Sequence, residues 1–456
     1  MRVLVCIVSY GLKNAIYLEK VLNEYRRMPF KVKLVVCSDR HRQLGKDVEI
    51  RVGLPSRNPY SLPFAHKKIF SERVNEYDLF IYSEDDMLVT EANVNTFLKL
   101  TGCLPEDCIS GFLRYEVDGY GKRYFPDAHR RFHWVLNSVE KHGGEIFARF
   151  KNDHSAAYML TRHQLRKAID SGGYLVSPHE GDYDLRESAA TDPYTQCGFR
   201  RLLCISLLSD IFIHHMPNVY IGRMGIGFDE LQKQIEALLI SNNSHCELFD
   251  TCKKLKVRYW DKWFYEDTDP IIIEALSGPN MRILSIGAGW GRLEEDVKRL
   301  GHYIVGVPID NVIAASLRFR GIDVKEVKSQ PLWNELKSSK FDCVILSNVL
   351  QHLNDPVECI NRFTEIVGPD GIIIAKIPNF KFFRWKSNCP PSGMVSNLNC
   401  IDIQGLRKLF TNIGYKIKVV PTGSERINNL YRLTGPIFAS RFARSFVLIA
   451  SRTTRF

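Results

Sequence analysis

The chain is constrained most by a rhythm of apolar runs and amphipathic stretches that occurs twice. Residues 2–10 and 30–39 are strand-like stretches rich in apolar residues, and residues 14–28 between them have the spacing of an amphipathic helix. The same order returns from residue 281, where MRILSIGAGWG, YIVGVPID and FDCVILSNV are separated by helical patterns. Strands that alternate with helices form parallel sheets covered by helices. The sequence therefore predicts an α/β protein with two doubly wound domains.

The boundary between the two domains is indicated by a change of character. Between residues 225 and 255 the chain becomes a polar helical stretch interrupted by Ser-Asn-Asn-Ser. With 456 residues the chain is also too long for one ordinary core. We predict a first domain at residues 1–224, a helical linker at 225–254 and a second domain at 255–456.

Composition narrows the compartment and the partners. No apolar run reaches the roughly 18 residues needed to cross a bilayer, so any membrane contact would be peripheral, at the inner face. The 12 cysteines are scattered without a C-x-x-C pair, which indicates reduced thiols in a cytoplasmic protein and disfavours a zinc site. The net charge of +11 favours an anionic partner, although a solvated surface explains it equally well.

The strand predicted before residue 84 ends in three consecutive carboxylates, Glu84, Asp85 and Asp86. Because side chains alternate along a strand, Glu84 and Asp86 share one face. The carboxyl end of a parallel strand is where α/β sheets bind ligands, and hard oxygen ligands suit Mg²⁺ or Mn²⁺. We predict a metal site at Glu84 and Asp86. The alternative is an acidic turn that caps the following helix.

This layout, with an aromatic-rich strand that ends in an acidic triplet, resembles the GT-A class of nucleotide-sugar glycosyltransferases over residues 1 to about 222. That class has a D-x-D-type metal site at this position, and here Glu84 takes the first place. The resemblance implies a GT-A-like sheet and metal-dependent transfer of a sugar. The donor would be a nucleotide-diphosphate sugar, and the acceptor a glycan or lipid-linked glycan.

The same resemblance assigns roles to further residues. A late histidine completes the metal shell in many such enzymes, and alternation puts only one of His214 and His215 on a given face. We favour His215, with a structural histidine pair as the alternative. Asp39 follows the second strand, where such enzymes hold the nucleoside, and His66 and Lys67 open a helix from which they could meet the diphosphate. Each of these three is otherwise a surface residue.

Inverting sugar transfer needs a carboxylate that takes the proton of the acceptor hydroxyl. The stretch HEGDYDLRESAATDPY contains Asp184 and Glu187, which share one face if the stretch is helical. Its position resembles the acceptor-side helix of inverting enzymes, so both residues are candidates for the catalytic base. Helix capping by Asp182 or Asp184 is the alternative.

The second half opens with a buried strand that turns through Gly287, Gly289 and Gly291 into a helix. Glycines are needed where the backbone turns sharply and approaches a ligand. A dinucleotide fingerprint would require a small residue at position 292, where Arg292 stands. The pattern therefore predicts a ligand-binding loop but disfavours a nicotinamide or flavin cofactor.

The stretches VLQHLNDP and GPDGIIIAKIPN closely resemble class I S-adenosylmethionine-dependent methyltransferases of the ubiquinone-biosynthesis type, from about Arg258 onwards. The resemblance implies a Rossmann-like domain that binds S-adenosyl-L-methionine at the carboxyl edge of its sheet. The glycine loop would lie beneath the methionine part and Asn348 near the reactive end. His352 is the candidate base for methylation of a glycan hydroxyl, with an interior structural histidine as the alternative.

One departure from this family concerns the ribose of the donor. The family usually has an acidic residue after the second strand, and Pro308 stands there. The nearest acid is Asp310, which would have to substitute through a shifted loop. The acid expected after the third strand is also absent, so a non-methylating domain is an alternative.

Together these features predict a bifunctional enzyme of glycan assembly, which transfers a sugar with its first half and a methyl group with its second. A nucleic-acid or small-molecule methyltransferase with a non-catalytic N-terminal binding domain is the alternative, and a catalytically silent domain is a third. We expect no nucleic-acid partner, because no basic stripe with interleaved aromatic residues is present.

Overall fold

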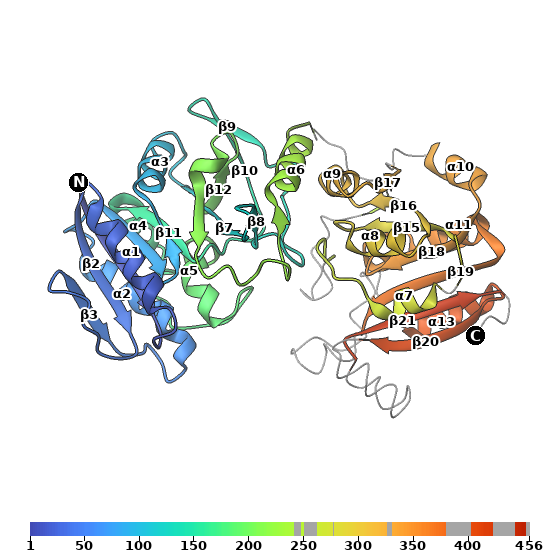
Figure 1. Ribbon diagram of the computed structural model, residues 1–456, viewed down its shortest axis with the longest axis horizontal. Coiled ribbons are helices and arrows are strands. Elements are labelled where there is room, and N and C mark those ends of the chain that lie inside the picture. Colours follow the sequence, from blue (N-terminus) through green and yellow to red (C-terminus); the bar gives the residue numbers. More distant parts are fainter. Residues whose placement is uncertain are drawn as a thin grey trace. The chain divides into compact units, whose positions relative to one another are not determined.

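The computed structural model describes residues 1–240, 248–249, 262–276, 278–325, 331–379, 403–422 and 443–452. It divides into two compact units (Figure 1). The first unit comprises Met1–Ala128 and Phe132–Leu231, and the second comprises His129–Arg131 and Gln232–Phe456. Much of the predicted linker and the predicted start of the second domain lie outside the described residues, so the predicted boundaries remain predictions.

The main sheet of the first unit has five strands in the order β11-β4-β1-β2-β3. Four of them are parallel: β1 (Arg2–Ser9), β2 (Lys31–Ser38), β3 (Val48–Val52) and β4 (Leu79–Glu84). The fifth, β11 (Ala157–Thr161), is antiparallel to β4. Helices α1 (Ala15–Arg27), α2 (Ala65–Glu72) and α4 (Arg162–Asp170) connect or follow these strands. Strands β1 and β4 are apolar and almost wholly buried, as expected for strands covered on both faces, whereas the edge strand β3 is largely exposed or half-buried.

Two smaller sheets complete the first unit. One has the order β6-β12-β10-β9, with β6 (Cys108–Ser110), β12 (Arg200–Cys204), β10 (Glu145–Ala148) and β9 (Glu140–His142). The other has the order β14-β8-β7-β13-β5, with β14 (Ile226–Gly227), β8 (Arg123–Phe125), β7 (Leu113–Val117), β13 (Phe212–His215) and β5 (Met87–Leu88). The remaining helices are η1 (Pro59–Phe64), α3 (Glu91–Thr101), α5 (Leu185–Thr195), η2 (Leu208–Ile211) and α6 (Phe228–Ile240). In the second of these sheets His215 pairs with Met87, which brings the end of β13 beside the acidic triplet.

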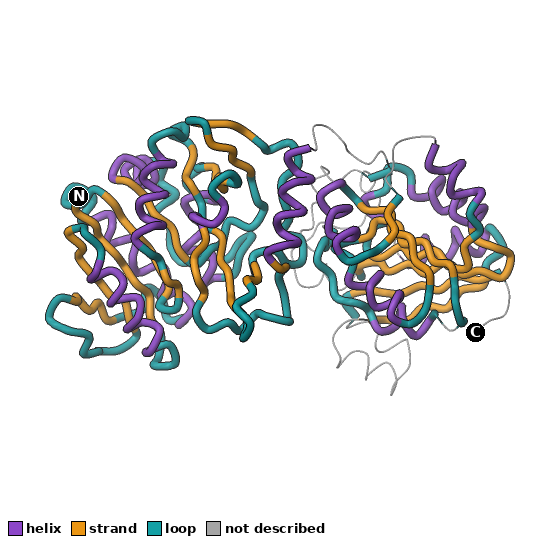
Figure 2. The backbone as a smooth tube through the Cα atoms, turned by 45° about the horizontal axis from the view of Figure 1, so that its top comes forward, coloured by secondary structure: helices purple, strands orange, loops and turns teal. Residues whose placement is uncertain are grey.

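The second unit has a seven-stranded sheet in the order β17-β16-β15-β18-β19-β21-β20. Strands β15 (Arg282–Ala288), β16 (Tyr303–Pro308), β17 (Asp323–Val324), β18 (Phe341–Ser347) and β19 (Val367–Pro378) are parallel. Strand β21 (Ser445–Ser451) is antiparallel to both β19 and β20 (Lys416–Thr422). Figure 2 shows helices on both sides of these strands. The Rossmann-like sheet predicted for this half is confirmed.

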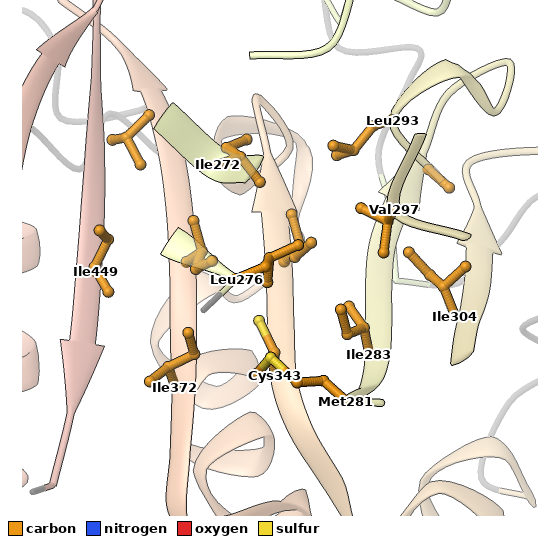
Figure 3. Packing of buried hydrophobic residues seen from close by; sticks show 14 of the residues in the cluster. Ile272, Leu276, Met281, Ile283, Leu293, Val297, Ile304, Cys343, Ile372 and Ile449 are labelled. Carbon is orange, nitrogen blue, oxygen red and sulfur yellow. The ribbon is translucent and has the colours of Figure 1, made fainter. Parts of the chain in front are cut away.

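The helices of this unit are α7 (Pro270–Ala275), α8 (Arg292–Arg299), α9 (Asn311–Phe319), α10 (Pro331–Ser338), η4 (Leu350–His352), α11 (Pro356–Ile366) and α13 (Ile403–Asn412). Helix α7 begins at a proline whose predecessor, Asp269, accepts a hydrogen bond from the Ile271 backbone N–H at 3.0 Å. Ile272 of this helix and Leu276, which directly follows it, lie in the same buried cluster as Ile283 of β15 (Figure 3). Each such side chain contributes about 1.5–3 kcal/mol on burial, so α7 anchors the segment before it to the sheet.

Within the described part of the chain, every helix is too short or too polar to cross a membrane. Peripheral membrane contact stays a prediction.

Two candidate active sites

The three carboxylates at the end of β4 have different neighbours. Asp85 accepts hydrogen bonds from Ser9 Oγ and, at 2.7 Å, from Asn14 Nδ2, so it ties β4 to the loop after β1. Asp86 accepts from the same Asn14 amide at 2.9 Å, and its buried Oδ1 atom has no hydrogen-bond partner among the described residues. Because an unpaired buried carboxylate oxygen is costly, Asp86 is a candidate for binding a ligand.

His215 approaches this edge from β13. Its Nε2 atom lies 3.6 Å from Asp86 Oδ2, and its Nδ1 atom lies 2.6 Å from Glu116 Oε1. Glu116 is fully buried and also accepts hydrogen bonds from the backbone N–H groups of residues 219–221 at 2.8–3.0 Å. Because Nδ1–H donates to Glu116, the imidazole presents Nε2 to Asp86. Glu116 therefore sets the orientation of His215.

Several side chains near this edge have displaced pKa values. Burial and the charge of Asp86 raise the pKa of Glu84 to about 7, and burial raises that of Asp85 to about 6. Burial lowers the pKa of His154, whose Nε2 lies 3.9 Å from Glu84 Oε1, to about 4. For His215, burial is outweighed by the carboxylate of Asp86 and by the hydrogen bond to Glu116, which together raise the pKa to about 9. Such clusters are typical of functional sites.

The raised pKa of His215 predicts a pH-dependent stability. Its protonated form is bound by two carboxylates only in the folded chain, so its contribution is complete below pH 6.5 and is lost as the pH rises to about 9. The pKa difference corresponds to about 3 kcal/mol. We expect the difference in unfolding free energy between the wild type and His215→Gln to shrink by about this amount between pH 6 and pH 9. A constant difference in urea unfolding across this range would contradict the assignment.

The predicted metal set is only partly assembled. Asp86 and His215 lie next to each other, whereas Glu84 lies beside His154. Across the residues that the structure describes, no group of three or more His, Cys, Asp or Glu side chains is arranged to hold a metal ion. The metal role of Glu84, Asp86 and His215 stays a prediction.

His66 and Lys67 lie inside the first unit. The two ring nitrogens of His66 contact Pro63 O and Tyr158 Oη, and the ring is fully buried. Lys67 is 2% exposed and forms an ion pair with Asp192. Both side chains are therefore engaged with protein partners, and the expectation that they are surface residues is wrong. Their contact with a diphosphate stays a prediction.

Asp39 and the two candidate bases are placed as follows. Asp39 follows β2 and accepts a hydrogen bond from the Gly11 backbone N–H at 2.9 Å, at the same edge as the end of β4. Asp184 caps α5, because Oδ1 accepts from the backbone N–H groups of Arg186 at 2.9 Å and Glu187 at 3.0 Å. The capping alternative is therefore confirmed for Asp184. Glu187 lies in the first turn of the helix and is partly exposed.

In the second unit, an open pocket lies at the carboxyl ends of β15 and β18. It is lined by the glycine loop, by Ser347 and by residues between 262 and 269. Gly287 and Gly291 have φ angles of 68° and 100°, a conformation that side chains rarely adopt. Gly291 is also the residue from which α8 starts. The predicted turn from strand to helix is therefore present.

Gly289 is where another chain segment crosses the loop. A Cβ atom at this position would lie 2.4 Å from the backbone oxygen of Phe264. The next residue, Trp290, donates its backbone N–H to that oxygen at 2.8 Å and its indole N–H to Glu266 O at 3.1 Å. The segment before α7 thus covers the glycine loop, which the sequence pattern did not indicate.

Charged side chains that sequence reasoning missed lie beside this pocket. Glu266 Oε1 accepts from Asn348 Nδ2 at 2.5 Å and from Lys376 Nζ at 2.8 Å. Lys376 also lies 3.1 Å from Asp269 Oδ2. Although burial opposes the charged forms, this pairing lowers the pKa of Glu266 and raises that of Lys376. The sequence does offer a signal for Lys376, because it is the one charged residue in the apolar run GIIIAKIP. No comparable sequence signal marks Glu266.

Residues 260–419 match the family model described as a methyltransferase domain. The second unit carries a methyltransferase domain. The ubiquinone biosynthesis O-methyltransferase of Bartonella tribocorum is 30% identical over 112 residues, which cover 23% of this chain and 44% of that protein. The protein of the same description from Azorhizobium caulinodans is 33% identical over 103 residues, which cover 22% and 41%. The chain thus spans less than half the length of these curated relatives.

Solved structures similar to this chain include a SAM-dependent methyltransferase from Archaeoglobus fulgidus, with 16% identity and a TM-score of 0.29, covering 40% of this chain and 90% of that one. Magnesium protoporphyrin IX methyltransferase from Synechocystis, with bound SAH, has 15% identity and a TM-score of 0.30, covering 40% and 80%.

Asn348, Asp310 and His352, the other predicted residues of the methyltransferase domain, have different surroundings. Asn348 has a left-handed backbone with φ of 49°, and its buried Oδ1 has no hydrogen-bond partner among the described residues. Such backbone strain is concentrated at functional sites. Asp310 caps α9, accepting from the Ile313 backbone N–H at 2.8 Å. His352 lies in η4 and is 3% exposed. The assigned roles of Asn348, Asp310 and His352 stay predictions.

Proposed function

We propose that the second unit transfers a methyl group from S-adenosylmethionine to a hydroxyl oxygen of its substrate. The observation that carries this proposal is the match of residues 260–419 to the methyltransferase family. The pocket at the carboxyl ends of β15 and β18 supports it, since α/β sheets bind ligands at that edge. Transfer to oxygen is supported by relatives described as O-methyltransferases. When bound, the donor supplies an electrophilic methyl group on a positively charged sulfur.

The chain's own residues would hold the donor and manage the acceptor proton. The loop at Gly287, Gly289 and Gly291 would provide backbone groups for the donor, and the unpaired oxygen of Asn348 would accept a donor N–H. His352 would take the proton of the acceptor hydroxyl, which is too weak an acid to ionise alone. The acceptor hydroxyl belongs, in our proposal, to a glycan.

Calorimetric titration with S-adenosylmethionine and S-adenosylhomocysteine tests the proposal. We expect the wild type to bind both, and Asn348→Ala to bind them roughly tenfold more weakly, because one hydrogen bond to a charged ligand is lost. The control is Asn354→Ala, which changes an exposed asparagine after η4 and should leave both affinities unchanged. Absence of binding to the wild type would refute the proposal.

As a second candidate function, we propose that the first unit transfers a sugar from a nucleotide-diphosphate donor with the help of Mn²⁺ or Mg²⁺. It rests on the unpaired Asp86 oxygen beside the imidazole that Glu116 orients. Two protein ligands are compatible with such an ion, because substrate phosphates and water supply the rest of its shell. Glu187 would be the base towards a glycan or lipid-linked acceptor, because Asp184 is occupied as a helix cap.

We expect Asp86→Asn to weaken Mn²⁺-dependent binding of UDP- or GDP-sugars at least tenfold, because a charged ligand of the ion is lost. Isothermal titration with and without Mn²⁺ measures this, and Asp210→Asn, at an exposed acid of η2, is the control. Because the ion must displace a proton from His215, we also expect the Mn²⁺ affinity to rise between pH 7 and pH 9. Binding that needs no Mn²⁺ or is indifferent to Asp86 would exclude this function.

A further inference from the structure

Two side-chain oxygen atoms at the pocket of the second unit have unused hydrogen-bonding capacity: one belongs to Glu266, which lines the pocket, and the other to Asn348, which is hydrogen-bonded to Glu266. Glu266 Oε2 accepts only a long hydrogen bond, from Ser347 Oγ at 3.3 Å, among the contacts described for it. Asn348 Oδ1 is buried without a partner among the described residues, and its own Nδ2 donates to Glu266. The side chains are therefore fixed against each other with spare acceptors. A ligand that donates several N–H bonds would satisfy both.

The charge of the pocket points to a cation. Its lining includes four acidic side chains, Glu266, Asp267, Asp269 and Glu294, but two basic ones, Lys262 and Arg292. Side chains of both signs have protein partners. Lys262 Nζ donates to Ser347 O at 2.6 Å, and Arg292 lies 3.6 Å from Asp296. Among the acids, Asp269 lies 3.1 Å from Lys376 Nζ and Glu294 accepts from Ser285 Oγ at 2.6 Å, which leaves Glu266 Oε2 and Asp267 as the acidic groups with spare capacity. An excess of acid in a pocket raises the local concentration of positively charged ligands.

Glu266 contacts both the glycine loop and the residue that follows β18. Its backbone oxygen accepts the indole N–H of Trp290 in the glycine loop. Its carboxylate accepts a hydrogen bond from the side-chain amide of Asn348, the residue that follows β18. At the end of β16, by contrast, Pro308 provides no carboxylate, and Asp310 is engaged as the cap of α9. Acidic groups therefore gather at the end of the pocket next to the glycine loop and β18, not at the end of β16.

We propose that Glu266, together with the Oδ1 atom of Asn348, binds the α-ammonium group of the methyl donor. This inference rests on the proposed methyltransferase function. An ammonium group has three N–H donors, and the two oxygens with spare capacity are acceptors only. Lys376 Nζ donates to Glu266 Oε1 at 2.8 Å, which leaves Oε2 for the ligand, and Lys376 is itself held by Asp269. Glu266 is thus a specificity-determining residue that favours donors with a free amino group.

The test compares two ligands on several variants by isothermal titration: S-adenosylhomocysteine, and its analogue that lacks the α-amino group. Because S-adenosylhomocysteine has no sulfonium charge, any loss of affinity for it in a variant reports on the ammonium group. We expect Glu266→Gln to bind S-adenosylhomocysteine roughly 10- to 100-fold more weakly than the wild type and the analogue equally well. Glu266→Asp keeps the charge and should retain intermediate affinity. Glu365→Gln, at an exposed glutamate of α11, is the matched control.

The outcomes separate this inference from the function on which it rests. If the wild type binds neither S-adenosylmethionine nor S-adenosylhomocysteine, both the methyltransferase function and the role of Glu266 are overturned. If the wild type binds S-adenosylhomocysteine but Glu266→Gln binds it equally well, or loses both ligands to the same degree, the role of Glu266 alone is overturned. Lys376 keeps Asp269 as a partner in Glu266→Gln, so the variant should fold, and its thermal melting is recorded alongside.

Discussion

Replacing Asp192 with alanine is expected to lower the free energy of unfolding of the first unit by about 3–5 kcal/mol. Asp192 is fully buried in α5 and accepts hydrogen bonds from Lys67 Nζ and, at 3.0 Å, from His179 Nε2. Without this carboxylate the ammonium of Lys67 would stay buried beside the rings of Phe64 and Tyr174, whose centroids lie 4.6 Å and 5.6 Å from Nζ, with no opposite charge among the described residues to balance it. Burial already lowers the pKa of Lys67, against the attraction of Asp192.

Urea unfolding of the full chain measures this loss, and hydrogen exchange of the amides in α2 and α5 assigns it to the first unit. The matched control is the double variant Lys67→Met with Asp192→Leu. Removing both charges leaves no unpaired ion, so we expect it to recover most of the lost stability. If Asp192→Ala lowers the free energy of unfolding by less than about 1 kcal/mol, the pair of Lys67 and Asp192 is not needed for folding.

Replacing Gly289 with alanine is expected to weaken binding of S-adenosylhomocysteine at least 100-fold. The new Cβ would lie 2.4 Å from the backbone oxygen of Phe264, which cannot rotate away as a side chain would. The segment that carries Glu266 must therefore move away from the glycine loop, which breaks the hydrogen bond from Trp290 N–H to Phe264 O. Overpacking of this kind costs about 1–3 kcal/mol in stability, and here the same displacement disrupts the pocket.

Gly278→Ala is the control, because a Cβ there meets nothing closer than 3.4 Å and neither glycine has a positive φ. Titration calorimetry measures the affinity of both variants, and circular dichroism follows their melting. We expect Gly278→Ala to bind as the wild type does. Unchanged affinity in Gly289→Ala would mean that the segment before α7 is not part of the donor site.

The parts of this fold that could be predicted from the sequence are those that depend on local pattern. Strands β1, β4 and β15 are runs of apolar residues, because each is buried on both faces of its sheet. Polar residues at the ends of such strands mark the binding edge, so the acidic triplet and the glycine loop were found. Glu84 and Asp86 were expected on one face, but the turn after Glu84 ends the strand, so alternation no longer fixes their directions.

The residues that could not be predicted act across long sequence separations. Glu116 lies 99 residues from His215, and Glu266 lies 82 residues from Asn348. No spacing rule relates such pairs, because the pairing of strands from different parts of the chain brings them together. Asp184 and Asp310 show a second limit: a carboxylate before a helix can cap the helix or bind a ligand, and local sequence does not separate these roles.

The position of β21 between β19 and β20 has a consequence for biosynthesis. Although β21 follows every other described strand in the sequence, it pairs with β19 on one side and β20 on the other. On the ribosome, β19 and β20 therefore stay unjoined until Ser451 has left the exit tunnel, whereas every strand of the first unit has been translated by Gly227. A nascent chain cut before Ser445 would keep all strands of its first unit but expose two open sheet edges, which chaperones and proteases recognise.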